Sequence, residues 1–346
     1  MPHPMFGTSV IAAPMAGGTS TPSFVTAVHR AGGLGFLAAG YKDPAAMAAE
    51  IRSVRATGAR FGMNVFVPDP AQLPPGPAVT AALEAYRQEL IPEADRYGVE
   101  LPAPRLDDDD RWQEKIELLL ADPVELVSFT FGLPGADVVR RLQRAGSLVL
   151  ATVTGVAEAR LAEEQGVDAL VVQHSCAGGH SGAFLPGSRG TLQKDPAEGT
   201  TADLVRAVRA AVGLPLVAAG GIMDAAGVAG VLAAGAGAAQ VGTALLRTEE
   251  SGTRQLHKDA LASPRFTGTA MTRAFTGRAA RALVNEFVAA HPDAPEAYPA
   301  VHHLTAPLRA AAAAAGDPER LNLWAGTGWR QAQAGPAAGV LARLLG

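Results

Sequence analysis

The residues best suited to chemistry lie in one glycine-rich segment near the middle of the chain. His180 follows Ala177-Gly178-Gly179 and precedes Ser181-Gly182, so glycines on both sides give a ligand close access to its imidazole. A neutral imidazole accepts protons near physiological pH, so we predict that His180 is a general base. The alternative is a loop histidine that bonds its own backbone. His174 and Cys176 lie nearby, but without a fourth ligand the spacing does not indicate a metal site.

Two further segments predict a phosphate-binding site. Gly220-Gly221 and Gly242-Thr243 each follow a short apolar run, and glycines there would let a phosphate approach free backbone N–H groups. The hydroxyl of Thr243 adds a further polar group. Ordinary tight turns at both places are the alternative. The run Gly33-Leu34-Gly35-Phe36-Leu37-Ala38 has dinucleotide-like spacing, but it follows a helical pattern and opens into a strand, so it does not indicate dinucleotide binding.

The elements that must position these residues are short apolar runs with the composition of buried strands. We predict strands at Val10–Ala13, Leu34–Ala38, Phe61–Phe66, Glu125–Thr130, Leu148–Thr152, Ala169–Gln173, Leu216–Ala219 and Ala239–Val241. Amphipathic helical patterns lie between most of them, and several of these patterns end at a glycine. Eight strands alternating with helices predict an α/β protein with a (βα)8 barrel, the TIM barrel, and a doubly wound open sheet is the alternative.

Two additions to the barrel are predicted. An insertion at residues 68–123 follows the third strand, begins proline-rich, and carries helices around Val79–Tyr97 and Arg111–Leu120. We interpret its acidic run, Asp107 to Asp110, as a solvated loop before a helix. The chain is thus divided into a barrel at residues 1–250, with that insertion, and a mainly helical C-terminal cap region at residues 251–346. His302-His303 and the pair Trp324 and Trp329 are interpreted as packing or cap residues.

Composition limits the environment and the partners. The chain has 346 residues, of which 48% are hydrophobic and 18% charged, which excludes a disordered protein. A formal net charge of −4 argues against nucleic acid or an anionic membrane as the main partner. The single cysteine, Cys176, and an N-terminus without signal-peptide features favour a soluble cytoplasmic enzyme. Its expected partner is a small-molecule substrate, and a homodimer is one option for the oligomeric state.

Short motifs spread over nearly the whole chain carry a family resemblance. They are Ala13-Pro14-Met15-Ala16-Gly17-Gly18-Thr19-Ser20-Thr21-Pro22, Ala31-Gly32-Gly33-Leu34-Gly35-Phe36, Gly62-Met63-Asn64-Val65-Phe66, Val127-Ser128-Phe129-Thr130-Phe131-Gly132-Leu133-Pro134, the Ala177–His180 run, Val217-Ala218-Ala219-Gly220-Gly221-Ile222, Thr272-Arg273-Ala274-Phe275-Thr276-Gly277-Arg278 and Leu323-Trp324-Ala325-Gly326. Their order and spacing resemble the nitronate monooxygenases, formerly called 2-nitropropane dioxygenases, an FMN-dependent (βα)8 family. The Phe-Gly-Leu-Pro segment and the Thr-Pro of the first loop resemble its class I branch.

The resemblance implies a cofactor, a reaction and a set of site residues. The cofactor is FMN, and the reaction is the oxidation of alkyl nitronates, or of nitroalkanes, by O2 to a carbonyl compound and nitrite. His180 and Asn64 are the implied catalytic residues. The implied FMN contacts are Pro14 and Met15 beside the ring, Asn64 and Gln173 at its polar edge, and Gly178, Gly179, Gly220, Gly221, Gly242 and Thr243 around ribityl and phosphate.

One departure from the family pattern bears on substrate preference. Relatives commonly read Gln-Gly-x-Glu-Ala-Gly-Gly-His-Arg-Gly, whereas this chain reads Gln173-His174-Ser175-Cys176-Ala177-Gly178-Gly179-His180-Ser181-Gly182 and lacks the acid and the arginine. Three alternatives stay open. They are an NAD(P)H-dependent flavin or enoyl-thioester reductase on the same fold, a non-redox lyase or isomerase that binds a sugar phosphate, and a flavin-binding protein without catalysis.

Overall fold

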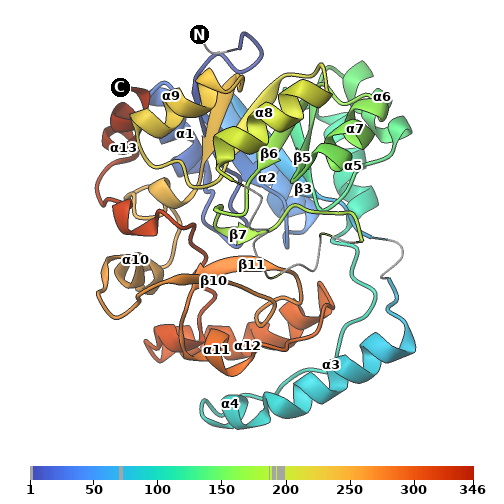
Figure 1. The fold of residues 1–346 in the computed structure, drawn as a ribbon. Helices are drawn as coiled ribbons and strands as arrows, with labels where there is room; N and C mark the ends of the chain where they lie inside the picture. Colours follow the sequence, from blue (N-terminus) through green and yellow to red (C-terminus); the bar gives the residue numbers. More distant parts are fainter. Residues whose placement is uncertain (1–2, 70–72, 187, 189–191, 193–198) are drawn as a thin grey trace.

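The eight predicted strands close into one parallel barrel in the computed structural model, which describes residues 3–69, 73–186, 188, 192 and 199–346 (Figure 1). In order around the barrel they are β1 (Val10–Ala12), β2 (Leu34–Ala38), β3 (Phe61–Phe66), β4 (Leu126–Thr130), β5 (Leu148–Val153), β6 (Ala169–Gln173), β8 (Leu216–Ala219) and β9 (Ala238–Val241). The predicted TIM barrel is therefore confirmed, and the open-sheet alternative is excluded. Each strand starts and ends within one residue of its predicted bounds.

Helices cover the outside of the barrel. They are α1 (Pro22–Arg30), α2 (Pro44–Arg55), α5 (Trp112–Ala121), α6 (Ala136–Arg144), α7 (Val156–Glu164), α8 (Thr201–Ala211), α9 (Ala225–Ala233) and α13 (Ala337–Leu345). Side chains cap several of their N-termini, since the hydroxyl of Thr21 accepts from the N–H of Phe24 and the carboxylate of Asp43 accepts from the N–H of Ala46.

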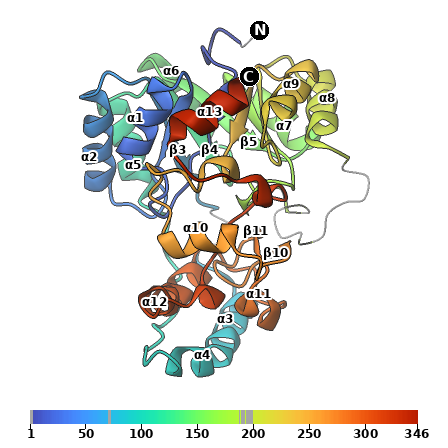
Figure 2. The same cartoon turned by 90° about the vertical axis from the view of Figure 1, so that its left-hand side faces the viewer.

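Two of these helices belong to segments that the sequence assigns to additions. Helix α5 lies in the predicted insertion but packs between α2 and α6, and its Ile116 and Leu119 join the barrel core. Helix α13 lies in the predicted cap region but packs against α1 and α9 (Figure 2), with Val340 and Leu341 in the same core. The chain thus leaves the barrel after β9 and returns to supply its last outer helix. The division near residue 250 stays a prediction.

A second layer lies below the carboxyl ends of the barrel strands (Figures 1 and 2). Its helices are α3 (Pro77–Glu89), α4 (Ile91–Asp95), α10 (Gln255–Ala262), α11 (Glu286–Ala290) and α12 (Ala300–Ala314), with short 3-10 turns at Pro318–Arg320 and Trp329–Gln331. A further 3-10 turn, Thr243–Leu245, directly follows barrel strand β9. The predicted helix around Val79–Tyr97 is thus two helices, which meet at Leu90 just before Pro92. Residues 70–72 of the predicted insertion lie outside the described residues.

The second layer also contains a sheet that the sequence did not predict. Strands β10 (Thr269–Thr272), β11 (Ala280–Leu283) and β7 (Gly179–His180) form an antiparallel sheet between the barrel and the helices α11 and α12 (Figure 1). The expectation of a mainly helical region therefore missed two strands. These strands are four residues long, and β11 pairs with residues about a hundred positions earlier, so no local pattern gives their register.

The interior of the barrel is filled by side chains rather than open. Phe36 projects into it beside Gly62, where an added Cβ would lie 2.2 Å from the Phe36 ring, so only glycine fits there. Its neighbours in this inner cluster include Ile11, Leu150 and Val217. No helix in the described part of the chain is both long and apolar enough to cross a membrane.

Candidate active site

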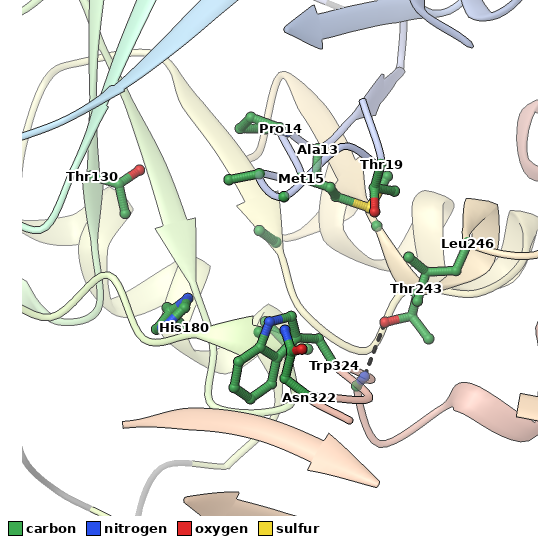
Figure 3. A pocket seen from close by; sticks show the side chains of 18 of the residues that line it. Ala13, Pro14, Met15, Thr19, Thr130, His180, Thr243, Leu246, Asn322 and Trp324 are labelled. Atoms are coloured by element: carbon green, nitrogen blue, oxygen red, sulfur yellow. Dashed lines mark hydrogen bonds between the residues drawn. The ribbon is translucent and has the colours of Figure 1, made fainter. Parts of the chain in front are cut away.

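A cavity of about 460 Å³ lies at the carboxyl ends of the barrel strands, facing the second layer (Figure 3). Such a volume is in the range of cofactor and substrate pockets, about 300–1,000 Å³. The residues predicted for the site all line it: Pro14, Met15, Asn64, Gln173, Gly178, Gly179, His180, Gly220, Gly221, Gly242 and Thr243. The structure therefore brings the predicted set together, while the role of each residue stays a prediction.

His180 sits in β7, where its backbone pairs with Ala280 of β11. Its Nε2 lies 2.9 Å from Oγ1 of Thr276, and its ring is 5.2 Å from the Trp324 ring and 5.6 Å from the Phe131 ring. Burial, and then the nearby Arg278 and Arg309, lower the pKa of His180 to about 3. The imidazole is therefore neutral at physiological pH, but it is a weaker base than the sequence suggests.

The chain around His180 is held through its backbone by Gln173. The Gln173 amide donates from Nε2 to the carbonyl of His180 (3.1 Å) and accepts at Oε1 from the N–H of Gly182 (2.6 Å). Arg278 adds a bond from Nε to the carbonyl of Ser181 (3.2 Å), and Ser181 donates its N–H to Ala279 (2.8 Å). Gln173 thus positions the histidine segment, and its implied contact with a flavin edge stays a prediction.

Asn64 links the carboxyl ends of two strands. Its Nδ2 lies 3.1 Å from the carbonyl oxygen and 2.9 Å from Oγ of Ser128, and 3.0 Å from Oγ1 of Thr130. Thr130 in turn lies 3.3 Å from Thr152, which continues this polar row onto β5. Asn64 is only 2% exposed, so it serves the β3–β4 packing as well as lining the cavity.

The predicted phosphate loops contain two kinds of glycine. At Gly242 an added Cβ would meet only the side chains of Ala13 and Met15, at 3.5 and 3.6 Å. The backbone at Gly242 does not require glycine, and the missing side chain leaves open space in the cavity. At Gly220 φ is +114° and an added Cβ would lie 2.8 Å from the carbonyl oxygen of His174, so the fold itself requires glycine there. Gly221 also has a positive φ, +71°.

The C-terminal segment around Gly326 also lines the cavity beside the predicted phosphate loops, although the sequence did not assign it to the site. The N–H of Gly326 donates to Oγ1 of Thr243 (2.9 Å), the bond drawn dashed in Figure 3. An added Cβ at Gly178 would lie 2.5 Å from the Gly326 nitrogen, so the two glycine turns pack backbone to backbone. The Gly326-Thr327-Gly328 spacing after Leu323-Trp324-Ala325 was the available signal, and both Gly326 and Gly328 line the cavity.

Side chains of the second layer close the cavity from the other side. His302 stacks on Tyr41, with ring centroids 4.0 Å apart and an interplanar angle of 3°, and both line the cavity together with Trp324. His302 and Trp324 thus lie in the layer that caps the barrel, as interpreted from the sequence, and they also line the cavity. Trp329 is buried outside the cavity beside Arg330, as packing would require.

The acidic run is not a freely solvated loop. The Asp108 carboxylate contacts Nε2 of His303, which lowers the pKa of Asp108 to about 2. Asp110 pairs with the buried Lys115. His303 lies 195 residues after Asp108, and Lys115 belongs to the helix that follows the run. The composition of the run therefore indicated only a solvated loop. The loop instead contacts α12 through Asp108 and α5 through Asp110.

Comparisons with known proteins give the family. Residues 5–346 match the family model described as "Nitronate monooxygenase". The chain belongs to the nitronate monooxygenase family. It is 35% identical over 341 residues to a probable nitronate monooxygenase of Staphylococcus aureus (strain MRSA252), covering 97% of this chain and 93% of that protein. The resemblance inferred from short motifs is therefore confirmed.

Two solved structures are also similar to the chain. Nitroalkane oxidase from Streptomyces ansochromogenes is 47% identical with a TM-score of 0.90, over 98% of this chain and 95% of that one. FabK from Thermotoga maritima shares the fold at 24% identity and a TM-score of 0.73, over 98% and 92% of the two chains. Family membership makes the protein an oxidoreductase, and the family implies a flavin as its cofactor.

Proposed function

We propose that this nitronate monooxygenase family member binds FMN and oxidises alkyl nitronates with O2 to a carbonyl compound and nitrite. The observation that carries the proposal is one cavity with two different ends. At one end, Gly221, Gly242 and Thr243 meet the Gly326 turn, and at the other lie His180 and Asn64. The first end suits a terminal phosphate, and the second suits a redox ring and its substrate.

The residues present fit FMN. An added Cβ at Gly242 would occupy part of the proposed phosphate site without contacting any backbone atom. Folding therefore does not require glycine at this position, whereas a bound phosphate would. Pro14 and Met15 supply apolar surface against which a flat ring can lie. When bound, the flavin accepts electrons from an electron-rich substrate and passes them to O2.

The chain's own side chains bind and orient the substrate and exclude water. Phe131 and Trp324 lie against the His180 ring, with Tyr298 also 5.9 Å from it, so the space beside His180 is enclosed by aromatic surface. A nitronate already carries the negative charge and needs no deprotonation. A neutral nitroalkane needs removal of its α-proton, for which His180 is the candidate base, although its lowered pKa makes it a weak one.

Both substrate forms are relevant, since a structurally similar protein is named a nitroalkane oxidase. The low basicity of His180 favours the nitronate as the better substrate. The neutral nitroalkane is the second candidate, with a slower reaction that depends on His180.

The first test is the visible spectrum of the purified protein, followed by identification of the released flavin and a nitrite assay with the preformed nitronate. We expect a yellow protein with one FMN per chain. Gly242→Leu should empty the site, because its side chain would project into the cradle. The matched control is Gly230→Leu, at an exposed position of α9 where an added Cβ meets nothing within 4 Å.

Each rival gives a different result in the same assays. Extraction of FAD, or full flavin occupancy in Gly242→Leu, contradicts the cofactor assignment. A yellow protein that releases no nitrite but is bleached by NADPH without oxygen favours a reductase. A colourless protein that cannot be reconstituted with FMN favours a non-redox enzyme.

A further inference from the structure

The charged side chains that line the cavity are of one sign. Among the described lining residues there is no Asp, Glu or Lys, and there are two arginines, Arg254 and Arg309. Burial lowers the pKa of the three lining histidines, His180, His257 and His302, to about 3, 4 and 2. These rings are neutral at physiological pH, so the side chains give the cavity a net positive charge.

Arg309 is the buried one of the two arginines. It projects from α12, is only 9% exposed, and makes four hydrogen bonds, all to uncharged groups. Nε donates to Oγ1 of Thr305 (3.1 Å), and Nη1 donates to Oδ1 of Asn322 (3.2 Å). Nη2 lies 3.3 Å from Nδ1 and 3.0 Å from the carbonyl oxygen of His302. A guanidinium has five N–H groups, so these four bonds leave one N–H and the positive charge for a ligand in the cavity.

Two other buried cations of the chain have carboxylate partners. Lys115 pairs with Asp110 at 2.8 Å, and Arg320 pairs with Glu93 at 2.9 Å. Within the described part of the chain, Arg309 makes no ion pair with a carboxylate. Burial lowers the pKa of Arg309 to about 10, which leaves it charged at neutral pH. A buried charge without a counter-ion is unfavourable, so an anionic ligand that enters the cavity would remove this cost.

We infer that Arg309 is the anion subsite of the cavity and that it binds the planar oxyanion of the substrate. The identity of that anion rests on the proposed function, for which it is the nitronate. The two oxygens of a nitronate share its negative charge, as in a carboxylate, and a guanidinium held by Asn322 and Thr305 offers one of them its remaining N–H and its positive charge. Arg309 thus selects the nitronate over the neutral nitroalkane.

A flavin phosphate is the other anion that could use this arginine. The phosphate cradle, however, lies between the β8 and β9 loops and the Gly326 turn, whereas Arg309 bonds His302, which stacks on Tyr41 after β2. The phosphate therefore has its own donors, and Arg309 is left to the substrate. Loss of flavin on removing Arg309 would show the opposite.

The test is isothermal titration calorimetry of the holoenzyme with sodium nitrate, a planar oxyanion that is not a substrate, against chloride at equal ionic strength. We expect nitrate to bind, Arg309→Met to weaken that binding by about 10–100-fold, as for a lost charged hydrogen bond, and Arg309→Lys to regain part of it. The flavin content should stay unchanged. Arg330→Met is the matched control, because Arg330 lies over the Trp329 ring outside the cavity.

Steady-state kinetics give a second measurement on the same variants. We expect Arg309→Met to raise KM for the nitronate, and Arg309→Lys to raise it less. If Arg309→Met does not fold, Arg309→Lys and Asn322→Ala carry the test.

Either of two titration results overturns the inference: nitrate binds the wild type and Arg309→Met equally, or it does not bind the wild type at all. Loss of flavin in Arg309→Met also overturns it, because the arginine would then serve the phosphate. The nitrate titration needs no turnover. A protein that binds nitrate through Arg309 but forms no nitrite would therefore contradict the proposed function and not this subsite.

Discussion

Nζ of Lys115 lies 2.8 Å from Oδ2 of Asp110, and the Lys115 side chain is completely buried. The same Nζ donates to the carbonyl of Ala39 (2.9 Å), while Oδ1 of Asp110 accepts from the N–H of Tyr41 (2.9 Å). Tyr41 has φ +67°, an unusual conformation for a bulky residue, and its ring lines the active-site cavity. An ion pair between the loop before α5 and α5 itself therefore fixes one wall of the site from outside it.

We expect Lys115→Met to lower the free energy of unfolding by about 3 kcal/mol, because it leaves the Asp110 carboxylate half-buried without its partner. Urea denaturation measures this change. Arg140→Met is the control, since Arg140 and Asp137 form an ion pair in which both side chains are more than half exposed. The control should change stability by less than about 0.5 kcal/mol. A Lys115→Met protein as stable as the control would show that the pair does not support the fold.

The barrel could be predicted from the sequence because its strands are continuous apolar runs separated by helices that end at glycine. Such strands are buried on both faces, so their composition alone indicates them. The segments Gly220-Gly221 and Gly242-Thr243 then indicated where the site lies, since they fall after successive strands of that pattern.

The second layer could not be predicted in the same way. Strand β7 has two residues, and its pairing with β11 joins His180 to Ala280, so no local periodicity reveals it. Arg309 stands in an alanine-rich helix whose sequence does not indicate what the arginine contacts. Only the structure shows that its hydrogen-bond partners are neutral. The part of the site that could not be predicted is therefore the second layer, where residues far apart in the sequence come together.

Asn64 is expected to matter for both packing and turnover. Its Nδ2 contacts Ser128 and Thr130, so Asn64→Ala should lower the free energy of unfolding by about 1–2 kcal/mol, and should lower turnover of the folded protein much more. Thermal melting and turnover per folded chain measure the two effects. Ser128→Ala is the control, because it removes one hydroxyl of this network and leaves the amide in place. Unchanged turnover together with a large fall in melting temperature would assign Asn64 to packing alone.

The buried histidines should make the protein sensitive to mild acid. The pKa values of His180, His257 and His302 are lowered to about 3, 4 and 2, against an ordinary 6.5 in the unfolded chain. Below pH 6.5 the unfolded chain therefore binds more protons than the folded one, so stability is lost as the pH falls from about 6.5 toward 4. The lowered pKa of Asp108, about 2, contributes only below that range.

The measurement is the melting temperature between pH 7.5 and 4.5 for the wild type and His257→Gln. His257 bonds through Nε2 to the carbonyl of Trp324 (3.0 Å), and glutamine can donate similarly but does not titrate. The variant should therefore lose less stability in acid than the wild type. Identical slopes in the two proteins would mean that His257 does not stay neutral in the folded chain.

His180 is expected to have one role with the neutral nitroalkane and another with the nitronate. The two forms interconvert slowly enough to be supplied separately. His180→Ala should lower activity on the neutral form by about 10²–10⁴, the usual effect of removing a general base, and should spare most activity on the anion. Because the pKa of His180 is lowered to about 3, the wild-type rate on the neutral form should show no inflection near pH 6.5. Equal losses on both forms would refute the base assignment and leave His180 as a residue that positions substrate.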